Sequence, residues 1–117
     1  MKLVSDCLFC QIIEKKIPAQ VVYEYRKVLA FRDINPQAPV HIIIIPKSHI
    51  ERVSDLNREN VDYWAELVLA ANEIASELKI KESGYRLVIN CNRDAGQAVF
   101  HLHLHLLGGR KLTWPPG

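Results

Sequence analysis

The most constraining feature of this 117-residue sequence is a run near its C-terminal end in which histidine and leucine alternate. The run occupies residues 101–107 and reads His-Leu-His-Leu-His-Leu-Leu. A period of two is the pattern of a β-strand whose two faces differ. Leu102, Leu104 and Leu106 would then face a core, and the three histidines would form a row on the other face, spaced roughly 6.6–6.8 Å apart along the strand.

This row of imidazoles indicates a functional site. A single histidine on a strand is most often a core or surface residue whose ring nitrogens bond to a neighbour. Three histidines in register, with three leucines on the opposite face, are not explained by packing. The outer two, His101 and His105, would lie roughly 13 Å apart along the backbone, so all three cannot easily bind one metal ion at about 2.0–2.1 Å. We therefore expect a division of roles, in which one histidine binds a metal ion and two take part in the reaction. Neutral imidazole is a good nucleophile and proton carrier near pH 7, which suits displacement at phosphorus.

The run resembles the signature of the histidine-triad (HIT) family, in which three histidines alternate with apolar residues. Three other stretches, at residues 31–39, 41–47 and 96–100, are similar to further recurring segments of that family. The last four residues, Trp-Pro-Pro-Gly at 114–117, are similar to the tail of its Hint branch, the nucleoside phosphoramidases. The likeness covers essentially the whole chain.

Composition is typical of a single globular domain, which we place at residues 1–117. The hydrophobic content of 49% and charged content of 24% are ordinary for a soluble protein. The net charge of +2, without a dense basic run, favours neither nucleic acid nor a membrane surface as a partner. No stretch has the pattern of a signal peptide or a membrane span, which predicts a cytoplasmic location. Three cysteines, an odd number, suggest no disulfide framework.

The pattern of apolar residues predicts an α+β fold with a five-stranded, mainly antiparallel sheet. A short helix is expected to end at about Glu14, with Ser5 or Asp6 as its N-cap. A long amphipathic helix is expected over 57–79, with Asn57 as its N-cap, and would cover one face of the sheet. The resemblance implies a homodimer, in which the sheets of the two subunits join into a single ten-stranded sheet. Strands are expected over residues 21–25, 28–32, 41–45, 85–91 and 101–107.

Cys7 and Cys10 form a second candidate site, because they lie three residues apart on one face of the short helix. Three interpretations compete. Free cysteines are often buried without a function, a redox dithiol would favour a thioredoxin-like context that is missing, and a zinc half-site needs two more ligands. His49 and His101 would complete a Cys2His2 set of the structural type. The resemblance favours one structural zinc per subunit, held at these positions.

The resemblance implies hydrolysis of purine nucleoside 5′-phosphoramidates, of the adenosine 5′-monophosphoramidate type, to the nucleoside monophosphate. In the family's mechanism the middle histidine attacks the α-phosphorus, and water cleaves the nucleotidyl-histidine. Carried over by position, His103 is the nucleophile, His105, Gln97 and His41 hold or polarise the phosphate, and Asp33 takes the ribose hydroxyls. The implied nucleotide-binding set is Leu8, Phe9, Ile12, Phe31, Asp33, Ile34, Ile43, Asn90, Gln97, Ala98, Val99, His103, His105 and Trp114.

Several of these positions keep a second interpretation. His41 could be a strand-end residue that faces water, and Asn90 could close a turn, although the family has a site residue at each. Trp114 could belong to a frayed terminus, but a tryptophan is costly to expose, and the resemblance places it at the partner subunit's site. Ala98 departs from the family pattern, which commonly has a serine there, so a hydroxyl that would hold the phosphate or the leaving group is missing.

Other functions stay open on the sequence alone. One is hydrolysis of dinucleoside polyphosphates by an enzyme of the same superfamily, which the Trp-Pro-Pro-Gly tail disfavours. A nucleotidyl transferase is less favoured still, because that branch has glutamine as its third triad residue and this chain keeps His105. A different class is a zinc-stabilised nucleotide-binding partner protein with vestigial catalysis, for which Ala98 is the supporting feature.

Overall fold

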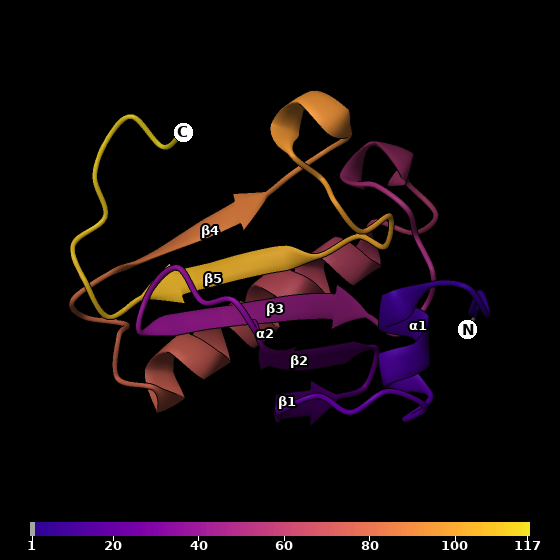
Figure 1. The fold of residues 1–117 in the computed structure, drawn as a ribbon, viewed down its shortest axis with the longest axis horizontal. Coiled ribbons are helices and arrows are strands. Elements are labelled where there is room, and N and C mark those ends of the chain that lie inside the picture. The colour runs from indigo at the N-terminus through magenta and orange to yellow at the C-terminus, as the bar shows by residue number, and fades with distance from the viewer. Residues whose placement is uncertain (1) are drawn as a thin grey trace.

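A five-stranded sheet with two helices makes up the computed structural model, which describes residues 2–117 (Figure 1). The elements are α1 (Leu8–Ile13), β1 (Val21–Tyr25), β2 (Val28–Arg32), β3 (Val40–Pro46), α2 (Asp62–Glu77), β4 (Tyr85–Ile89) and β5 (Leu104–Gly108). The strand order across the sheet is β1-β2-β3-β5-β4, and every neighbouring pair is antiparallel. The predicted α+β fold is therefore confirmed, with a sheet that is antiparallel throughout.

The two helices cover opposite faces of the sheet. In Figure 1, α2 lies behind the sheet, and α1 lies at the end of the sheet near the N-terminus. The isoleucine run of β3 needs both, because successive side chains of a strand point to opposite faces. Ile42 and Ile44 pack in the core beneath α2, whereas Ile43 and Ile45 pack in a second apolar cluster that contains Phe9 of α1.

The leucines of the histidine–leucine run anchor the centre of the sheet to α2. Leu102, Leu104 and Leu106 are each at most 1% exposed, and they belong to the same core as Leu67 and Ile74 of α2. Burying a leucine side chain contributes about 1.5–3 kcal/mol, so three in a row fix which face of this segment points inward. The predicted leucine face is confirmed, and the histidines at the intervening positions are directed to the other face.

β5 begins at Leu104, three residues later than the strand predicted over 101–107. The segment before it leaves the ladder with β3, because Pro46 at the end of β3 has no N–H to donate. The backbone N–H of Leu102 donates instead to the carbonyl of Ile50 at 2.6 Å. β4 correspondingly ends at Ile89, the register partner of Leu104, and not at residue 91.

The long helix is shorter than its predicted range of 57–79. It begins at Asp62, because Asn57 caps a separate turn in which its Oδ1 accepts hydrogen bonds from two backbone N–H groups. At the other end Lys79 has a φ of +63°, a left-handed conformation in which the helix cannot continue. Within residues 2–117, no helix has both the length and the apolar character needed to cross a bilayer.

The cap of the short helix also differs from the prediction. Its N-cap is Cys7 and not Ser5 or Asp6, because the Sγ of Cys7 accepts a hydrogen bond from the backbone N–H of Cys10 at 3.4 Å. The first turn of α1 therefore holds both sulfur atoms on one side.

Replacing a core leucine should cost far more stability than replacing its neighbour on the other face. For Leu106→Ala we expect a loss of about 2–5 kcal/mol in the free energy of unfolding, because the side chain is fully buried. Leu107→Ala, one residue away and outside both apolar clusters, is the matched control and should lose less. Urea denaturation measures both, and equal losses would contradict the assignment of faces.

Candidate active site and metal cluster

The face of the sheet opposite α2 carries a cluster of three histidines. His41 lies on β3, His105 lies on β5, and His103 immediately precedes β5. The ring centroids of His41 and His105 are 5.2 Å apart, and those of His103 and His105 are 5.0 Å apart. The structure therefore brings together the three residues predicted to be catalytic. His41 is 6% exposed, so it does not face water, and its catalytic role stays a prediction.

The hydrogen bonds of His41 determine where it and His105 carry their protons. The backbone N–H of Gln37 donates to Nδ1 of His41 at 3.0 Å, so a neutral His41 carries its proton on Nε2. That Nε2 lies 2.9 Å from Nδ1 of His105 and 3.3 Å from a carboxylate oxygen of Asp33. Nδ1 of His105 is then an acceptor, and a neutral His105 presents an N–H at Nε2. The Asp33–His41–His105 chain thus fixes a hydrogen-bond donor on the face of the sheet.

The same three side chains lie close enough together to suggest a metal site, but the proton positions argue against one. Ligand atoms of Asp33, His41 and His105 all lie within 4.8 Å of one another. A metal would need the lone pair of His41 Nε2, which would move the proton to Nδ1, against the N–H of Gln37. We therefore interpret this cluster as a hydrogen-bond relay.

His103 is oriented with one nitrogen bound to backbone and the other free to react. Its Nδ1 lies 2.7 Å from the carbonyl oxygen of His101, which can only accept, so Nδ1 carries the proton and Nε2 carries a lone pair. His103 is 8% exposed, and its ring packs edge-on against Phe9, with centroids 5.2 Å apart. A neutral imidazole with a fixed tautomer is what a nitrogen nucleophile requires.

Burial keeps this histidine cluster uncharged near neutral pH. It lowers the pKa of His103 below its usual 6.5, against the opposing effect of the hydrogen bond to the His101 carbonyl. For His105, burial and then repulsion from His103 and His41 lower the pKa to about 4. The pKa of His41 is also lowered by burial, although the Asp33 carboxylate opposes this. The site therefore presents N–H dipoles and a lone pair, and not imidazolium charges.

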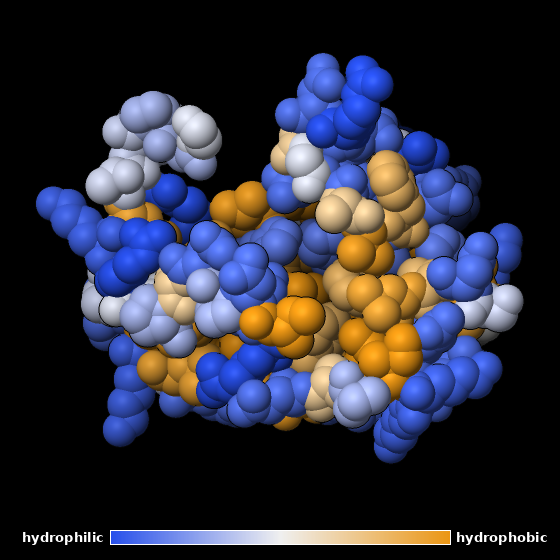
Figure 2. All heavy atoms as spheres, viewed as in Figure 1, coloured by the Kyte–Doolittle hydropathy of each residue, from blue (hydrophilic) through white to orange (hydrophobic). Residues whose placement is uncertain are grey.

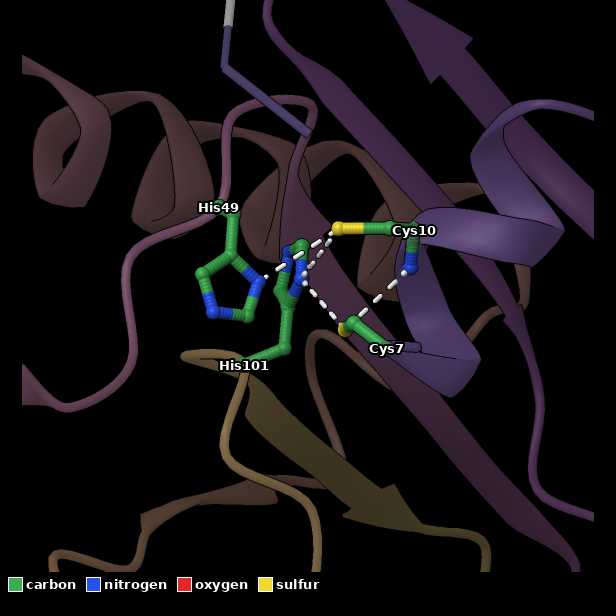
Figure 3. Close-up of side chains that lie close together, drawn as sticks. All are labelled: Cys7, Cys10, His49 and His101. Carbon is green, nitrogen blue, oxygen red and sulfur yellow. Dashed lines mark hydrogen bonds between the residues drawn. The ribbon is translucent and has the colours of Figure 1, made fainter. Parts of the chain in front are cut away.

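The four predicted metal ligands form a separate cluster at the end of α1 (Figure 3). Cys7 and Cys10 come from the first turn of α1, His49 from the segment after β3, and His101 from the segment before β5. Nδ1 of His101 lies 3.4 Å from Sγ of Cys7 and 3.6 Å from Sγ of Cys10. Nδ1 of His49 lies 3.4 Å from Sγ of Cys10. The four chosen from the sequence are therefore neighbours in space.

These distances fit a tetrahedral ion. With metal–sulfur bonds of about 2.3 Å and metal–nitrogen bonds of about 2.0–2.1 Å, sulfur and nitrogen ligands of one tetrahedral ion lie roughly 3.5 Å apart. His101 also has the second partner typical of a metal ligand, since its Nε2 lies 2.9 Å from the carbonyl oxygen of Pro46, which leaves the Nδ1 lone pair facing the cysteines. Burial raises the pKa of Cys10 to about 11, so a thiolate here needs a neighbouring cation.

Part of the predicted nucleotide-binding set lines the second apolar cluster. Phe9, Phe31 and Ile43 are each at most 8% exposed there, and Ile12 and Val99 pack against them. Apolar residues also gather on this side of the molecule next to α1 in the space-filling view (Figure 2).

The rest of the set is exposed or engaged elsewhere. Ile34 is fully exposed and Trp114 is 80% exposed, while Leu8 and Ala98 lie at the surface and Asn90 follows β4. The nucleotide-binding roles of all these residues stay predictions.

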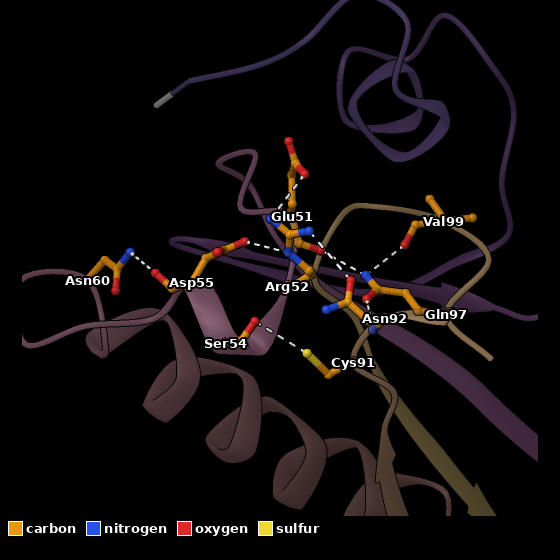
Figure 4. Close-up of polar contacts among 9 residues, drawn as sticks. All are labelled: Glu51, Arg52, Ser54, Asp55, Asn60, Cys91, Asn92, Gln97 and Val99. Atoms are coloured by element: carbon orange, nitrogen blue, oxygen red, sulfur yellow. Dashed lines mark hydrogen bonds and ion pairs between the residues drawn. The ribbon is translucent and has the colours of Figure 1, made fainter. Parts of the chain in front are cut away.

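Gln97, predicted to hold phosphate, braces a loop in this structure (Figure 4). Its Oε1 accepts a hydrogen bond from the backbone N–H of Asn92 at 2.8 Å, and its Nε2 donates to the carbonyls of Glu51 at 2.8 Å and Val99 at 3.1 Å. The bond to Glu51 ties the segment before the histidines to the segment after β3, and the other two lie within residues 92–99. The phosphate role of Gln97 stays a prediction, and its observed contacts are with backbone alone.

The sequence analysis missed the backbone groups that orient the imidazoles. The N–H of Gln37, the carbonyl of Pro46 and the carbonyl of His101 each fix one histidine. Every residue has such groups, so no residue type marks them. The Asp33–His41 contact was also missed, although an aspartate and a histidine flanking a proline-containing turn gave a weak signal.

Comparison with known proteins identifies the family. The HIT domain family model matches residues 14–112. The chain belongs to the HIT domain family. Within that match lie His49 and all three triad histidines, whereas Cys7 and Cys10 precede it and Trp114 follows it. The resemblance inferred from the triad is thereby confirmed, and its assignment to the Hint branch stays a prediction.

Several HIT proteins are similar over nearly the full length of this chain. An uncharacterized HIT-like protein of Synechocystis is 48% identical over 115 residues, covering 98% of this chain and 100% of that protein. The crystal structure of a HIT family hydrolase from Legionella pneumophila has a TM-score of 0.94 and 52% identity, over 96% of this chain and 100% of that one. A histidine triad nucleotide-binding protein from Candida albicans has a TM-score of 0.81 and 32% identity, over 94% and 83%.

The depressed pKa of His105 should make stability depend on pH. His105 has a pKa of about 4 in the folded protein and about 6.5 in the unfolded chain. Below pH 6.5 the unfolded chain therefore binds a proton at this residue, and the folded protein does not until the pH approaches 4. Between pH 7 and pH 4.5 the wild type should lose about 2 kcal/mol more of its unfolding free energy than His105→Gln, because glutamine does not titrate at this position. Urea denaturation at both pH values tests this. Metal loss affects both proteins alike, and parallel pH curves would contradict the prediction.

Proposed function

We propose that this HIT protein hydrolyses the phosphorus–nitrogen bond of purine nucleoside 5′-phosphoramidates and releases the nucleoside monophosphate. The observation that carries the proposal is the pairing of His103, whose Nε2 bears a lone pair, with His105, whose Nε2 bears a proton, at a ring separation of 5.0 Å. Similar structures described as HIT family hydrolases, and a relative named as a nucleotide-binding protein, support the reaction type and the ligand class.

The reaction follows from these proton positions. Nε2 of His103 attacks the α-phosphorus, the phosphorus–nitrogen bond breaks, and the leaving nitrogen departs as an amine with a proton from solvent. The Nδ1–H bond to the His101 carbonyl stabilises the positive charge that develops on the ring. The N–H of His105 donates to a phosphoryl oxygen, held in place by His41 and Asp33. Water then attacks the nucleotidyl-histidine and restores neutral His103.

We further propose that the metal cluster holds one structural zinc ion per chain. Cys7, Cys10, His49 and His101 supply two sulfur and two nitrogen donors, a set that zinc favours. All four positions of a tetrahedral ion are then filled by protein, so the zinc has no open position for substrate or water. It stabilises the fold and does not activate a nucleophile.

The remaining proposals concern assembly and location. We take residues 1–117 to be one cytoplasmic HIT domain that forms a homodimer with a ten-stranded sheet. The exposed Trp114 then contacts the partner subunit's site, and the apolar cluster near α1 receives the nucleoside, with Asp33 accepting hydrogen bonds from the ribose.

Removing the nucleophile should abolish turnover without abolishing binding. The wild type should hydrolyse adenosine 5′-phosphoramidate, His103→Ala should lose several orders of magnitude in kcat, and it should still bind AMP because the nucleoside pocket is elsewhere. His105→Ala should lose less, since it removes one stabilising donor worth about 1.5–3 kcal/mol.

Rapid quenching with labelled substrate should trap an acid-labile, base-stable adduct on the peptide that contains His103. Wild-type turnover by His103→Ala would refute the mechanism. A wild type that binds AMP but hydrolyses no phosphoramidate would favour the vestigial binding protein that Ala98 suggests.

Deleting residues 114–117 should change substrate preference and leave the fold intact. Trp114 is 80% exposed within its own chain, so its loss removes no core contact, but the partner's site loses one wall. Relative kcat/KM values across phosphoramidates with small and bulky leaving groups measure the effect, with thermal denaturation as the control. Unchanged relative rates would show that the tail is only a chain terminus.

A further inference from the structure

One residue joins the metal cluster to the nucleophile. His101 is completely buried, its Nδ1 faces the two cysteine sulfurs, and its own carbonyl oxygen receives the Nδ1–H of His103 at 2.7 Å. Its Nε2 meanwhile binds the Pro46 carbonyl at 2.9 Å. The position of the His101 side chain therefore helps to set the position of the carbonyl that orients the nucleophile.

A second connection runs through Phe9, which stands between the two cysteines in the sequence. Its ring packs edge-on against His103, with centroids 5.2 Å apart and an interplanar angle of 89°, and also against His101 at 5.9 Å. The turn that supplies both sulfur atoms thus also supplies a wall for the ring of His103. A movement of this turn would disturb both centres.

One cysteine of the pair, Cys7, lines a pocket at the surface. A pocket of about 640 Å³ has Cys7 and His49 in its lining, together with Lys2, Glu51 and Ala98. Cys7 is 8% exposed, whereas Cys10 is 0% exposed. A molecule the size of hydrogen peroxide therefore meets Cys7 first, with the sulfur of Cys10 within 4.8 Å behind it.

We propose that the metal cluster is a redox switch for the active site, in which His101 acts as the positioning residue for His103. The proposal rests on the proposed function in so far as His103 is the nucleophile. Two zinc-bound thiolates give two electrons to hydrogen peroxide: the bond between the sulfurs of Cys7 and Cys10 forms, the O–O bond breaks, two hydroxide ions are produced and Zn²⁺ is released. A dithiol reductant returns the two electrons, and zinc then binds again.

Oxidation removes both sulfur ligands from the metal. A disulfide brings the sulfurs to about 2.05 Å, whereas two sulfurs on one tetrahedral zinc lie roughly 3.8 Å apart, so the two cysteine side chains must turn toward each other. Nδ1 of His101 then loses its metal, and with it the contact that held the His101 side chain in place. His103 then loses its fixed tautomer, and the site loses its nucleophile while the sheet and α2 stay folded.

The experiment uses the full chain with Cys91→Ser, so that every titrated thiol belongs to the pair. The reduced protein should contain one zinc and two thiols per chain. Hydrogen peroxide should release that zinc to a chromogenic chelator and remove both thiols. Long-range ¹H–¹⁵N correlation should then show His103 changing from a single Nδ1–H tautomer to a mixture, and turnover should fall roughly 10–100-fold. Dithiothreitol with zinc should restore all four readings.

Retention of both thiols and of zinc under peroxide would overturn the proposal. So would oxidised, zinc-free protein with an unchanged His103 tautomer. The zinc and tautomer readings need no substrate, so they decide the switch even if the wild type hydrolyses no phosphoramidate, an outcome that would refute only the proposed function.

A pair of substitutions separates positioning from a general structural role. His101→Ala keeps the carbonyl but loses the metal ligand, whereas His101→Cys replaces the ligand with a sulfur and should retain zinc. We expect the alanine variant to lose the single His103 tautomer and about 10–100-fold in kcat, and the cysteine variant to recover most of both. A His101→Ala protein that keeps the tautomer and its kcat would show that the cluster does not position His103.

Discussion

The hydrogen bond from His103 to the carbonyl oxygen of His101 is the contact on which the site depends. It is short, buried, and formed between residues only two apart, and the group that accepts from the imidazole belongs to the main chain. The buried leucines stabilise this hydrogen bond, because Leu102 and Leu104 flank His103 and hold the backbone against α2. A carbonyl oxygen can only accept a hydrogen bond, so while this contact is kept, Nδ1 of His103 carries the proton and Nε2 stays free.

Around this bond the protein builds an active face with little formal charge. His41, His103 and His105 all have pKa values lowered by burial, and Asp33 is the one carboxylate placed against them in the described part of the chain. A neutral cluster binds an anion less tightly than a cluster of cations would. Preorganised dipoles can still stabilise the charge that develops in a transition state, so in the proposed reaction this arrangement would favour turnover over retention of the product.

The sequence predicts well the features that depend on the chemical type of the side chains. The leucine positions follow from periodicity, and the grouping of Cys7, Cys10, His49 and His101 in space follows from their shared ability to bind a metal. The start of β5 could not be predicted, because it depends on what faces it across the sheet: Pro46 lacks the N–H that would continue the ladder. The histidine tautomers could not be predicted either, because they depend on main-chain groups such as the N–H of Gln37, which donates to His41.

The long separation in sequence between partners in both centres has a consequence for how the protein folds. His41 and His105 are 64 residues apart, and Cys7 and His101 are 94 apart, whereas β1 and β2 are joined by a tight hairpin. Closing long loops costs more entropy and slows folding. An intermediate with β1, β2 and β3 in place but without residues 101–105 has two cysteines and His49, and it lacks the fourth ligand and the nucleophile. With zinc bound as proposed, full metal occupancy would report that the last strand has docked, and the metal content of a preparation would measure completed folding.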